Sequence, residues 1–164
     1  MKRTSLLRRS ALATALGAVL AGAFSLSSSA SAATTYWSFD NAVRGCLTAG
    51  TSGVVFETAC SAQNAFQDWQ WIGSADDHLQ NLATGLCLTT DDKSDVNAVW
   101  QGDCNASEHG QSWSFTYLGD GSRLGVLQTY WGTWLRATDT PNAVYTDAGI
   151  AGNPNYYNWS VGLQ

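Results

Sequence analysis

Aromatic side chains at one recurring position are the residues of this sequence best suited to binding. Phe56, Trp100 and Tyr145 each end a short apolar stretch, and they follow one another at a spacing of about 45 residues. An exposed aromatic ring can stack on the apolar face of a pyranose or anchor a contact with another protein. Local loops could equally cover the three rings as satellite core, so the pattern alone leaves all three interpretations open.

A second group of aromatic residues lies near Asn153-Pro154-Asn155: Tyr130, Trp131, Tyr156 and Tyr157. Aromatic residues close to Asn and Gly resemble a recognition surface. The same residues would also serve to fill a divergent part of the core, and the sequence does not choose between the two.

Residues able to catalyse a reaction are scarce. Nucleophilic catalysis needs a base held against Ser or Cys, and only His78 and His109 are available, each in a polar loop. No Gly-x-Ser-x-Gly elbow occurs. A carboxylate pair for glycoside cleavage stays open, because thirteen acidic residues offer many pairs. We expect a protein that binds, is not an enzyme and needs no cofactor.

Metal binding is also disfavoured. Asp91, Asp92 and Asp95 offer the hard oxygen ligands that calcium prefers, but no EF-type Gly or distal Glu follows them. The cysteines show no CxxC or His-paired spacing of a zinc site. A solvated acidic turn and no metal site are predicted.

The elements that would position these residues repeat three times. Each aromatic of the first group is followed, thirteen or fourteen residues later, by a tryptophan: Trp69, Trp113 and Trp159. Gln67 and Gln111 stand two places before the first two, and Tyr157 before the third. Self-similarity at a fixed period indicates units that bury their apolar faces against each other. We place the copies at about 36–72, 73–116 and 117–164.

Short β-branched and aromatic runs separated by Gly, Asn and Asp predict an all-β fold. Residues 33–164 have the length of one domain, and no Pro/Gly linker divides them. Three copies of a four-strand unit are too few to close a propeller, and they suit a threefold closed barrel with a hairpin cap.

Residues 1–32 read as a secretory signal peptide. Basic residues come first, an apolar run from Ala11 to Phe24 follows, and the segment ends in Ala30-Ser31-Ala32. Export by the general or the twin-arginine route stays open. Four of the eight Lys and Arg lie in this segment, so the remaining four against thirteen acidic residues give a formal charge of −9. An acidic, secreted, extracellular protein is predicted, with neither nucleic acid nor membrane insertion.

Four cysteines in an exported chain imply disulfides. Cys46 and Cys60 lie in the first copy, and Cys87 and Cys104 lie at matching places in the second. We predict Cys46–Cys60 and Cys87–Cys104, one in each of these copies. In the third copy Trp134 and Gly149 stand near the corresponding places.

In the first two copies Gly-Cys-Leu or Leu-Cys-Leu, an apolar stretch ending in an aromatic, a second Cys and Gln-x-Trp follow in a fixed order. This order resembles the ricin B-type lectin family over essentially the whole mature chain. The resemblance implies the β-trefoil fold, with six barrel strands and six strands in capping hairpins. It also implies that Gln67, Trp69, Gln111, Trp113 and Trp159 are chiefly structural.

The sugar-binding residues of that family are not intact here. Threonines occupy the places of the Asp that takes sugar hydroxyls, and the stacking aromatic and the Asn are also replaced. The replacing residues are Thr48 and Thr89, then Thr58, Gly102 and Asp147, and finally Phe66 and Gly110.

Two functions therefore stand side by side. The first is a secreted, stand-alone lectin that binds a glycan through outward aromatics. The second is a trefoil that has lost sugar binding and serves as a protein-binding subunit, adaptor or inhibitor in a secreted assembly. The candidate binding residues for either partner are Phe56, Trp100, Tyr145, Asp147, Trp131 and Tyr156.

Overall fold

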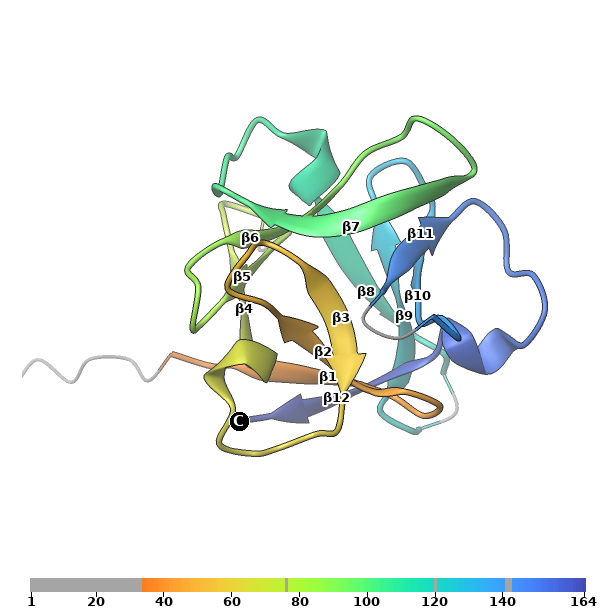
Figure 1. Cartoon of the computed structure of the whole chain (residues 1–164), viewed down its shortest axis with the longest axis horizontal. Helices are drawn as coiled ribbons and strands as arrows, with labels where there is room; N and C mark the ends of the chain where they lie inside the picture. Colours follow the sequence, from red (N-terminus) through yellow and green to blue (C-terminus); the bar gives the residue numbers. More distant parts are fainter. Residues whose placement is uncertain (1–33, 76, 120, 141–142) are drawn as a thin grey trace, which may run out of the picture. The chain divides into compact units, whose positions relative to one another are not determined.

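The computed structural model describes residues 34–75, 77–119, 121–140 and 143–164, so the predicted signal peptide lies outside the described residues. Within them the chain forms twelve short strands and three one-turn 3-10 helices (Figure 1). None of the described helices is long and apolar enough to cross a membrane. The elements are β1 Trp37–Asn41, β2 Gly45–Ala49, β3 Val55–Thr58, η1 Ala65–Gln67, β4 Trp69–Ile72, β5 His78–Asn81, β6 Cys87–Thr90, β7 Val96–Gly102, η2 His109–Gln111, β8 Trp113–Tyr117, β9 Leu124–Thr129, β10 Trp134–Arg136, β11 Tyr145–Asp147, η3 Pro154–Tyr156 and β12 Trp159–Leu163.

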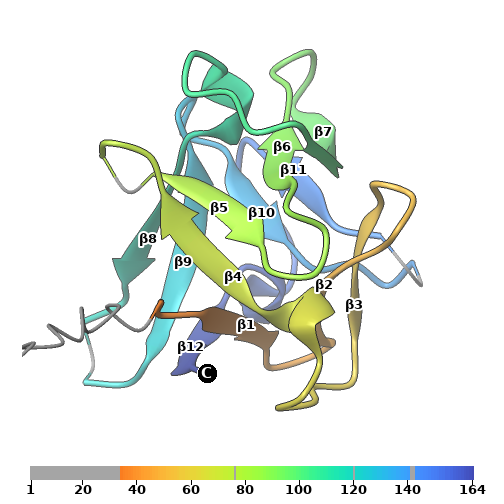
Figure 2. The ribbon, with the colours of Figure 1, turned by 90° about the vertical axis from the view of Figure 1, so that its left-hand side faces the viewer.

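Four consecutive strands and one 3-10 helix make up each of three copies, which confirms the predicted threefold all-β fold. The second and third strands of each copy form an antiparallel hairpin: β2–β3, β6–β7 and β10–β11. The first and fourth strands of the copies pair with one another around a barrel, as β1–β12, β1–β4, β4–β5, β8–β9 and β9–β12. Figure 1 looks onto the hairpins, and Figure 2 shows the barrel strands from the side.

The core repeats with the same threefold order. Side chains alternate along a strand, so each strand turns one apolar set inward. Each copy contributes an apolar residue from its first strand, a leucine from its second and a tryptophan at the start of its fourth. All nine are 3% exposed or less: Phe39, Leu79, Leu127, Leu47, Leu88, Leu135, Trp69, Trp113 and Trp159.

Each core tryptophan is also held by one hydrogen bond. The indole N–H of Trp69 donates to the Leu47 carbonyl at 3.1 Å, and Trp159 donates to Leu135 at 3.1 Å. The Trp113 indole donates to its own copy's leucine, Leu88, at 2.9 Å. The buried N–H and the buried carbonyl thus satisfy each other, as buried polar groups require.

Gln67 and Gln111 precede the first two core tryptophans by two places. Each holds the loop that follows its hairpin through side-chain hydrogen bonds. The Gln111 amide donates to the Thr89 hydroxyl and the Asp103 carbonyl, and its oxygen accepts the Asn105 N–H at 2.9 Å. Gln67 makes the corresponding three bonds in copy one. In copy three the fully buried Tyr157 takes this place, and its hydroxyl accepts the Ala151 N–H at 3.2 Å.

The predicted disulfides Cys46–Cys60 and Cys87–Cys104 are confirmed. Each joins the start of a hairpin to the loop beyond it, across 14 and 17 residues of sequence respectively. The strand register places Trp134 opposite Asp147, as Cys46 lies opposite Thr58. Trp134 therefore occupies the position of the first cysteine in copy three.

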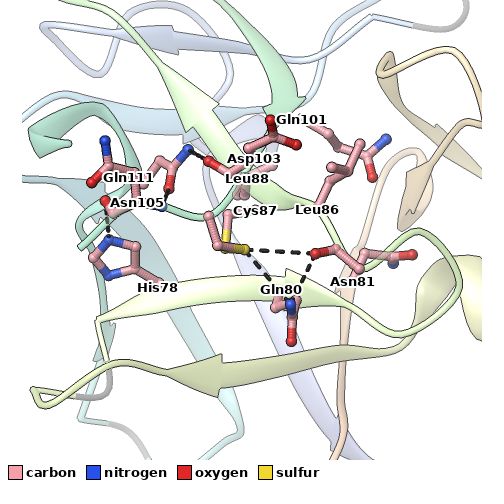
Figure 3. The surroundings of a disulfide bond; sticks show 12 residues. His78, Gln80, Asn81, Leu86, Cys87, Leu88, Gln101, Asp103, Asn105 and Gln111 are labelled. Atoms are coloured by element: carbon pink, nitrogen blue, oxygen red, sulfur yellow. Dashed lines mark hydrogen bonds between the residues drawn. A yellow bond between two sulfur atoms is a disulfide. The ribbon is translucent and has the colours of Figure 1, made fainter. Parts of the chain in front are cut away.

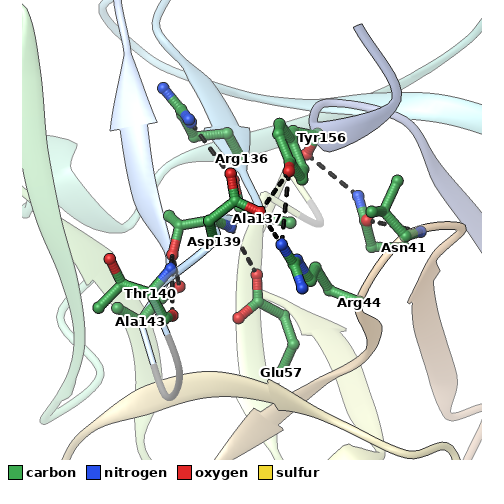
Figure 4. A network of polar contacts seen from close by, with 11 residues as sticks. Asn41, Arg44, Glu57, Arg136, Ala137, Asp139, Thr140, Ala143 and Tyr156 are labelled. Atoms are coloured by element: carbon green, nitrogen blue, oxygen red, sulfur yellow. Dashed lines mark hydrogen bonds and ion pairs between the residues drawn. The ribbon is translucent and has the colours of Figure 1, made fainter. Parts of the chain in front are cut away.

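Copies one and three meet around the half-buried side chain of Glu57 (Figure 4). Its carboxylate accepts the backbone N–H of Thr138 at 3.2 Å. Burial raises the Glu57 pKa to about 7, against the opposing influence of this N–H and of the Arg44 charge. Arg44 itself forms an ion pair with Asp139.

This raised pKa predicts a stability change with pH. Between about pH 4.5 and 7 the folded chain holds the Glu57 proton more tightly than the unfolded chain does, so stability falls as pH rises through this window. Glu57→Gln keeps an oxygen for the Thr138 N–H and carries no charge. We expect the variant to match the original chain at pH 4.5 and to exceed it by about 1–2 kcal/mol at pH 8, after discounting for solvent screening.

Urea denaturation at both pH values measures this difference. The carboxyl pKa values of Asp77 and Asp147 are lowered, so these groups titrate below the window. Burial raises the pKa of Asp68, but both proteins contain this residue, so its contribution cancels in the comparison. A Gln variant whose stability equals that of the original chain at pH 8 would rule out the charge penalty at Glu57.

Candidate functional site

A pocket of about 320 Å³ lies in copy two, between the β6–β7 hairpin and η2. The hairpin contributes the end of β6 and the outward side of β7, and the loop on either side of Cys104 contributes the polar residues Asp103, Asn105 and Glu108. The lining residues are Thr89, Thr90, Asp91, Lys93, Trp100, Gly102, Asp103, Asn105, Glu108 and Gln111.

Strand alternation turns Trp100 toward this pocket. Val99 and Gln101 are buried on one side of β7, and Trp100 is half-buried on the other. Gly102, on the same side as Trp100, leaves room beside the ring, since a Cβ there would lie 3.8 Å from the indole nitrogen and 3.3 Å from the Thr89 hydroxyl. Among the described residues the Trp100 indole N–H has no hydrogen-bond acceptor. A large ring and a free donor are thus offered at one wall.

The polar side chains at the floor of the pocket are already hydrogen-bonded within the protein. The Thr89 hydroxyl donates to the Cys87 carbonyl at 2.9 Å and accepts the Gln111 amide at 3.1 Å. The amide N–H₂ and the amide oxygen of Gln111 are both hydrogen-bonded to residues of copy two. These two residues hold the shape of the pocket and leave little hydrogen-bonding capacity for a ligand.

The polar side chains at the rim of the pocket, in contrast, have few hydrogen-bond partners within the protein. The exposed carboxylates of Asp103 and Glu108 have no hydrogen-bond or ion-pair partner among the residues that the structure describes. The Asn105 side-chain oxygen accepts the Ser107 N–H at 3.0 Å, while its amide N–H₂ is left for other acceptors. Asp91 pairs with Lys93 at the opposite edge. The pocket therefore presents acceptors, one amide donor and one aromatic ring.

The loop carrying these groups is fixed at several points (Figure 3). Cys104 ties it to β6, and the Asn105 N–H donates to Gln111. The Asn105 carbonyl lies 3.2 Å from Nε2 of the buried His78, whose Nδ1 lies 2.7 Å from the Asp77 carboxylate. Asp103 and Asn105 are consequently held in place before any ligand arrives.

The corresponding place in copy one lacks the carboxylates. Phe56 stands where Trp100 stands, and Ala59 replaces Asp103. Asn64 replaces Glu108, and its side chain accepts the Phe66 N–H as a helix cap.

In copy three the same place is filled by side chains. Arg136 donates to Asp147 at 3.1 Å, and the guanidinium lies 5.6 Å from the Tyr157 ring centroid. Asp147 also accepts the Tyr157 hydroxyl at 3.0 Å and the Gly149 N–H at 3.2 Å, and it is only 9% exposed. Despite burial, these donors hold the Asp147 pKa below its usual value. Its carboxylate is bound within the protein.

Phe56, Trp100 and Tyr145 are all half-buried. They are therefore neither fully exposed, as a binding surface would have them, nor fully covered as satellite core. Trp100 and Tyr145 line a second depression of about 380 Å³, where the three hairpins meet. Phe56 does not line it, and its place is taken by Val54, which is 49% exposed.

The remaining aromatic candidates lie in two separate places. Tyr156 belongs to the network of Figure 4, where its hydroxyl donates to Asp139 at 2.6 Å and Arg44 lies 5.6 Å from its ring centroid. Trp131 lies in the β9–β10 turn beside Tyr130, which stacks on His109 of copy two.

Sequence reasoning did not select Asp103, Asn105 or Glu108. Their signal is weak: one polar residue just before the second half-cystine and two between it and Gln-x-Trp, where copy one has Ala59, Ser61 and Asn64. Only an alignment of copy two with copy one shows that these three residues are particular to copy two.

No protein-family model and no curated protein matches this chain. Solved structures do resemble it. ThreeFoil, a designed threefold-symmetric protein, matches with a TM-score of 0.64 and 20% identity, over 77% of this chain and 96% of its own. A ricin B-like lectin of Macrolepiota procera, in complex with lactose, matches with a TM-score of 0.62 and 11% identity, over 80% of this chain and 96% of its own. A cytolethal distending toxin of Haemophilus ducreyi matches with a TM-score of 0.61 and 12% identity, over 77% of this chain and 82% of its own.

Proposed function

We propose that this chain, which has the β-trefoil fold of ricin B-like lectins, is a secreted, non-enzymatic carbohydrate-binding module. The pocket of copy two would be its sugar site. The observation that carries the proposal is the coexistence there of the Trp100 ring with the free carboxylates of Asp103 and Glu108. The lactose complex of the Macrolepiota procera lectin supports the assignment by analogy of fold.

A sugar fits this set of groups for a chemical reason. Pyranoses carry hydroxyls that donate hydrogen bonds, and ionised carboxylates are strong acceptors for them. The apolar face of the ring can pack on an indole, and the free indole N–H can donate to a sugar oxygen. The Asn105 amide adds a second donor. Copies one and three each lack part of this set, so we propose one site in each chain.

The proposed module is not an enzyme. Buried His78 faces Asp77 and the Asn105 carbonyl, and His109 stacks on Tyr130, so neither is set against a Ser or Cys nucleophile. All four cysteines form disulfides, which also accord with an extracellular environment.

The first test is a glycan array followed by calorimetry on the glycan bound best. We expect Asp103→Asn and Glu108→Gln each to weaken binding by about tenfold or more, because a hydrogen bond to a charged group contributes about 1.5–3 kcal/mol. Trp100→Ala should weaken it further. Asp92→Asn is the matched control, since it removes an exposed carboxylate near the pocket that does not line it. Equal affinity in the control and in Asp103→Asn would refute the site.

Protein binding is the second candidate. The apolar depression where the hairpins meet favours it, because Val54 in its lining is 49% exposed. The likeness to a toxin chain is compatible with a role in a secreted assembly. A blank glycan array, together with co-purification of another exported protein that Val54→Asp abolishes, would favour this candidate over the lectin.

A further inference from the structure

We infer that the sugar site extends beyond its pocket onto an aromatic platform, and that the ligand is a neutral oligosaccharide rather than a single sugar. The platform consists of His109 from η2 with Tyr130 and Trp131 from the β9–β10 turn. The inference rests on the proposed carbohydrate function and names the class of ligand that would be bound.

The rings of the platform are ordered against one another. Tyr130 and His109 stack with their centroids 4.2 Å apart and their planes 15° apart. Trp131 meets Tyr130 edge to face, at 6.3 Å and 84°. Tyr130 is nevertheless 62% exposed, the highest value among the large apolar side chains that the structure describes as exposed. A ring that is stacked on one side and still open to water can accept a second flat partner.

The turn that carries the two rings is rigid. The Gly132 N–H donates to the Thr129 carbonyl at 3.0 Å, and Gly132 has a φ of +86°, which glycine adopts without strain. The Thr129 and Thr133 hydroxyls bond each other at 2.7 Å, and Gln128 donates to the Gly132 carbonyl at 3.1 Å. Little conformational entropy is left to lose when a ligand settles on Tyr130 and Trp131.

The platform adjoins the pocket. Glu108 lines the pocket, and His109, the next residue, forms the base of the platform, so their Cα atoms are about 3.8 Å apart. The Tyr130 N–H donates to the Ser112 carbonyl at 3.0 Å, which joins the turn to the end of η2. Figure 1 shows the β9–β10 turn beside η2. The rings are therefore within reach of a second or third unit of a glycan seated in the pocket.

Charge selects the kind of glycan. Asp91, Asp103 and Glu108 surround the pocket, against Lys93 as its single cation. The chain as a whole is acidic, with a formal net charge of −5. Sulfated and uronic-acid sugars would bring like charges to this rim, which is unfavourable, whereas neutral sugars meet acceptors for their hydroxyls. The ring-bearing platform adds no charged carboxylate.

The test uses an immobilised panel of neutral, sulfated and uronic-acid glycans, each as a monosaccharide and as a tetrasaccharide with the same terminal unit. The original chain should prefer neutral tetrasaccharides to their monosaccharides. Tyr130→Ala should bind tetrasaccharides about threefold to tenfold more weakly and monosaccharides unchanged. Tyr117→Ala, which removes another exposed tyrosine at the far end of β8, should change neither.

Each outcome of this experiment supports or overturns a particular part of the inference. Loss of binding to both lengths in Asp103→Asn, with loss of only the tetrasaccharide gain in Tyr130→Ala, supports the platform. A tetrasaccharide gain that survives in both Tyr130→Ala and Trp131→Ala overturns it while the lectin proposal stands. Preference for anionic glycans overturns the neutral-ligand inference. A panel on which the original chain binds nothing overturns the lectin proposal, and the platform with it.

Discussion

Trp159→Ala is expected to destabilise the protein by about 3–5 kcal/mol, the range typical for truncating a buried aromatic to alanine. The indole is completely buried among the leucines of the core, and its N–H satisfies the Leu135 carbonyl. A domain of this size has a total stability of only about 5–15 kcal/mol, so the variant would be near its unfolding limit at 25 °C. Urea denaturation followed by far-ultraviolet circular dichroism measures the loss without relying on tryptophan emission.

Two further variants identify the cause of this loss. Trp159→Phe keeps an aromatic ring and removes the N–H, so it should cost less than Trp159→Ala but leave the Leu135 carbonyl unpaired, at about 1–3 kcal/mol. Trp131→Ala truncates a half-buried tryptophan outside the core and should cost less than either. A loss below 1 kcal/mol in Trp159→Ala would contradict the threefold core as the source of stability.

Removing the Cys87–Cys104 disulfide is expected to lower both stability and sugar binding, whereas removing Cys46–Cys60 should lower stability alone. In the chain-entropy model both crosslinks stabilise by about 3 kcal/mol, because their loops of 14 and 17 residues are similar in length. Only Cys104 adjoins Asp103 and Asn105 at the pocket. The paired alanine variants of each disulfide therefore form a matched experiment.

The measurements are the urea midpoint of each double variant and its affinity for the glycan that the array identifies. We expect similar falls in midpoint and a several-fold weaker affinity only where Cys87 and Cys104 are replaced, since the polar rim then loses one of its anchors. Equal affinities in the two double variants would show that Gln111 and His78 suffice to hold the rim.

Much of the architecture could be predicted because it follows from repeated local patterns. A period of about 45 residues with matched cysteines and tryptophans places equivalent residues in equivalent strands, so the disulfide partners and the barrel follow together. The alternation of side chains likewise puts Val99 on the inside of β7 and Trp100 on the outside. The degree to which Trp100 and Tyr145 are covered did not follow, because they lie where the hairpins of different copies meet.

The candidate site was only partly accessible to sequence reasoning. Trp100 was selected, but Asp103 and Glu108 were not, because a carboxylate is available to a ligand only if no neighbour already binds it. Asp147 shows the converse: its carboxylate is held by Arg136 and Tyr157, which lie eleven residues before it and ten after it. Nothing in the spacing of these residues distinguishes a bound carboxylate from a free one.

The sequence by itself determined that the chain folds as three equivalent all-β units with one disulfide in each of the first two, because side-chain periodicity and repeat spacing are local properties of the chain. Only the tertiary structure decided which copy keeps an open pocket, and that Tyr130 of copy three stacks on His109 of copy two beside it. The physical reason is that burial and hydrogen-bond satisfaction depend on residues brought together from distant strands.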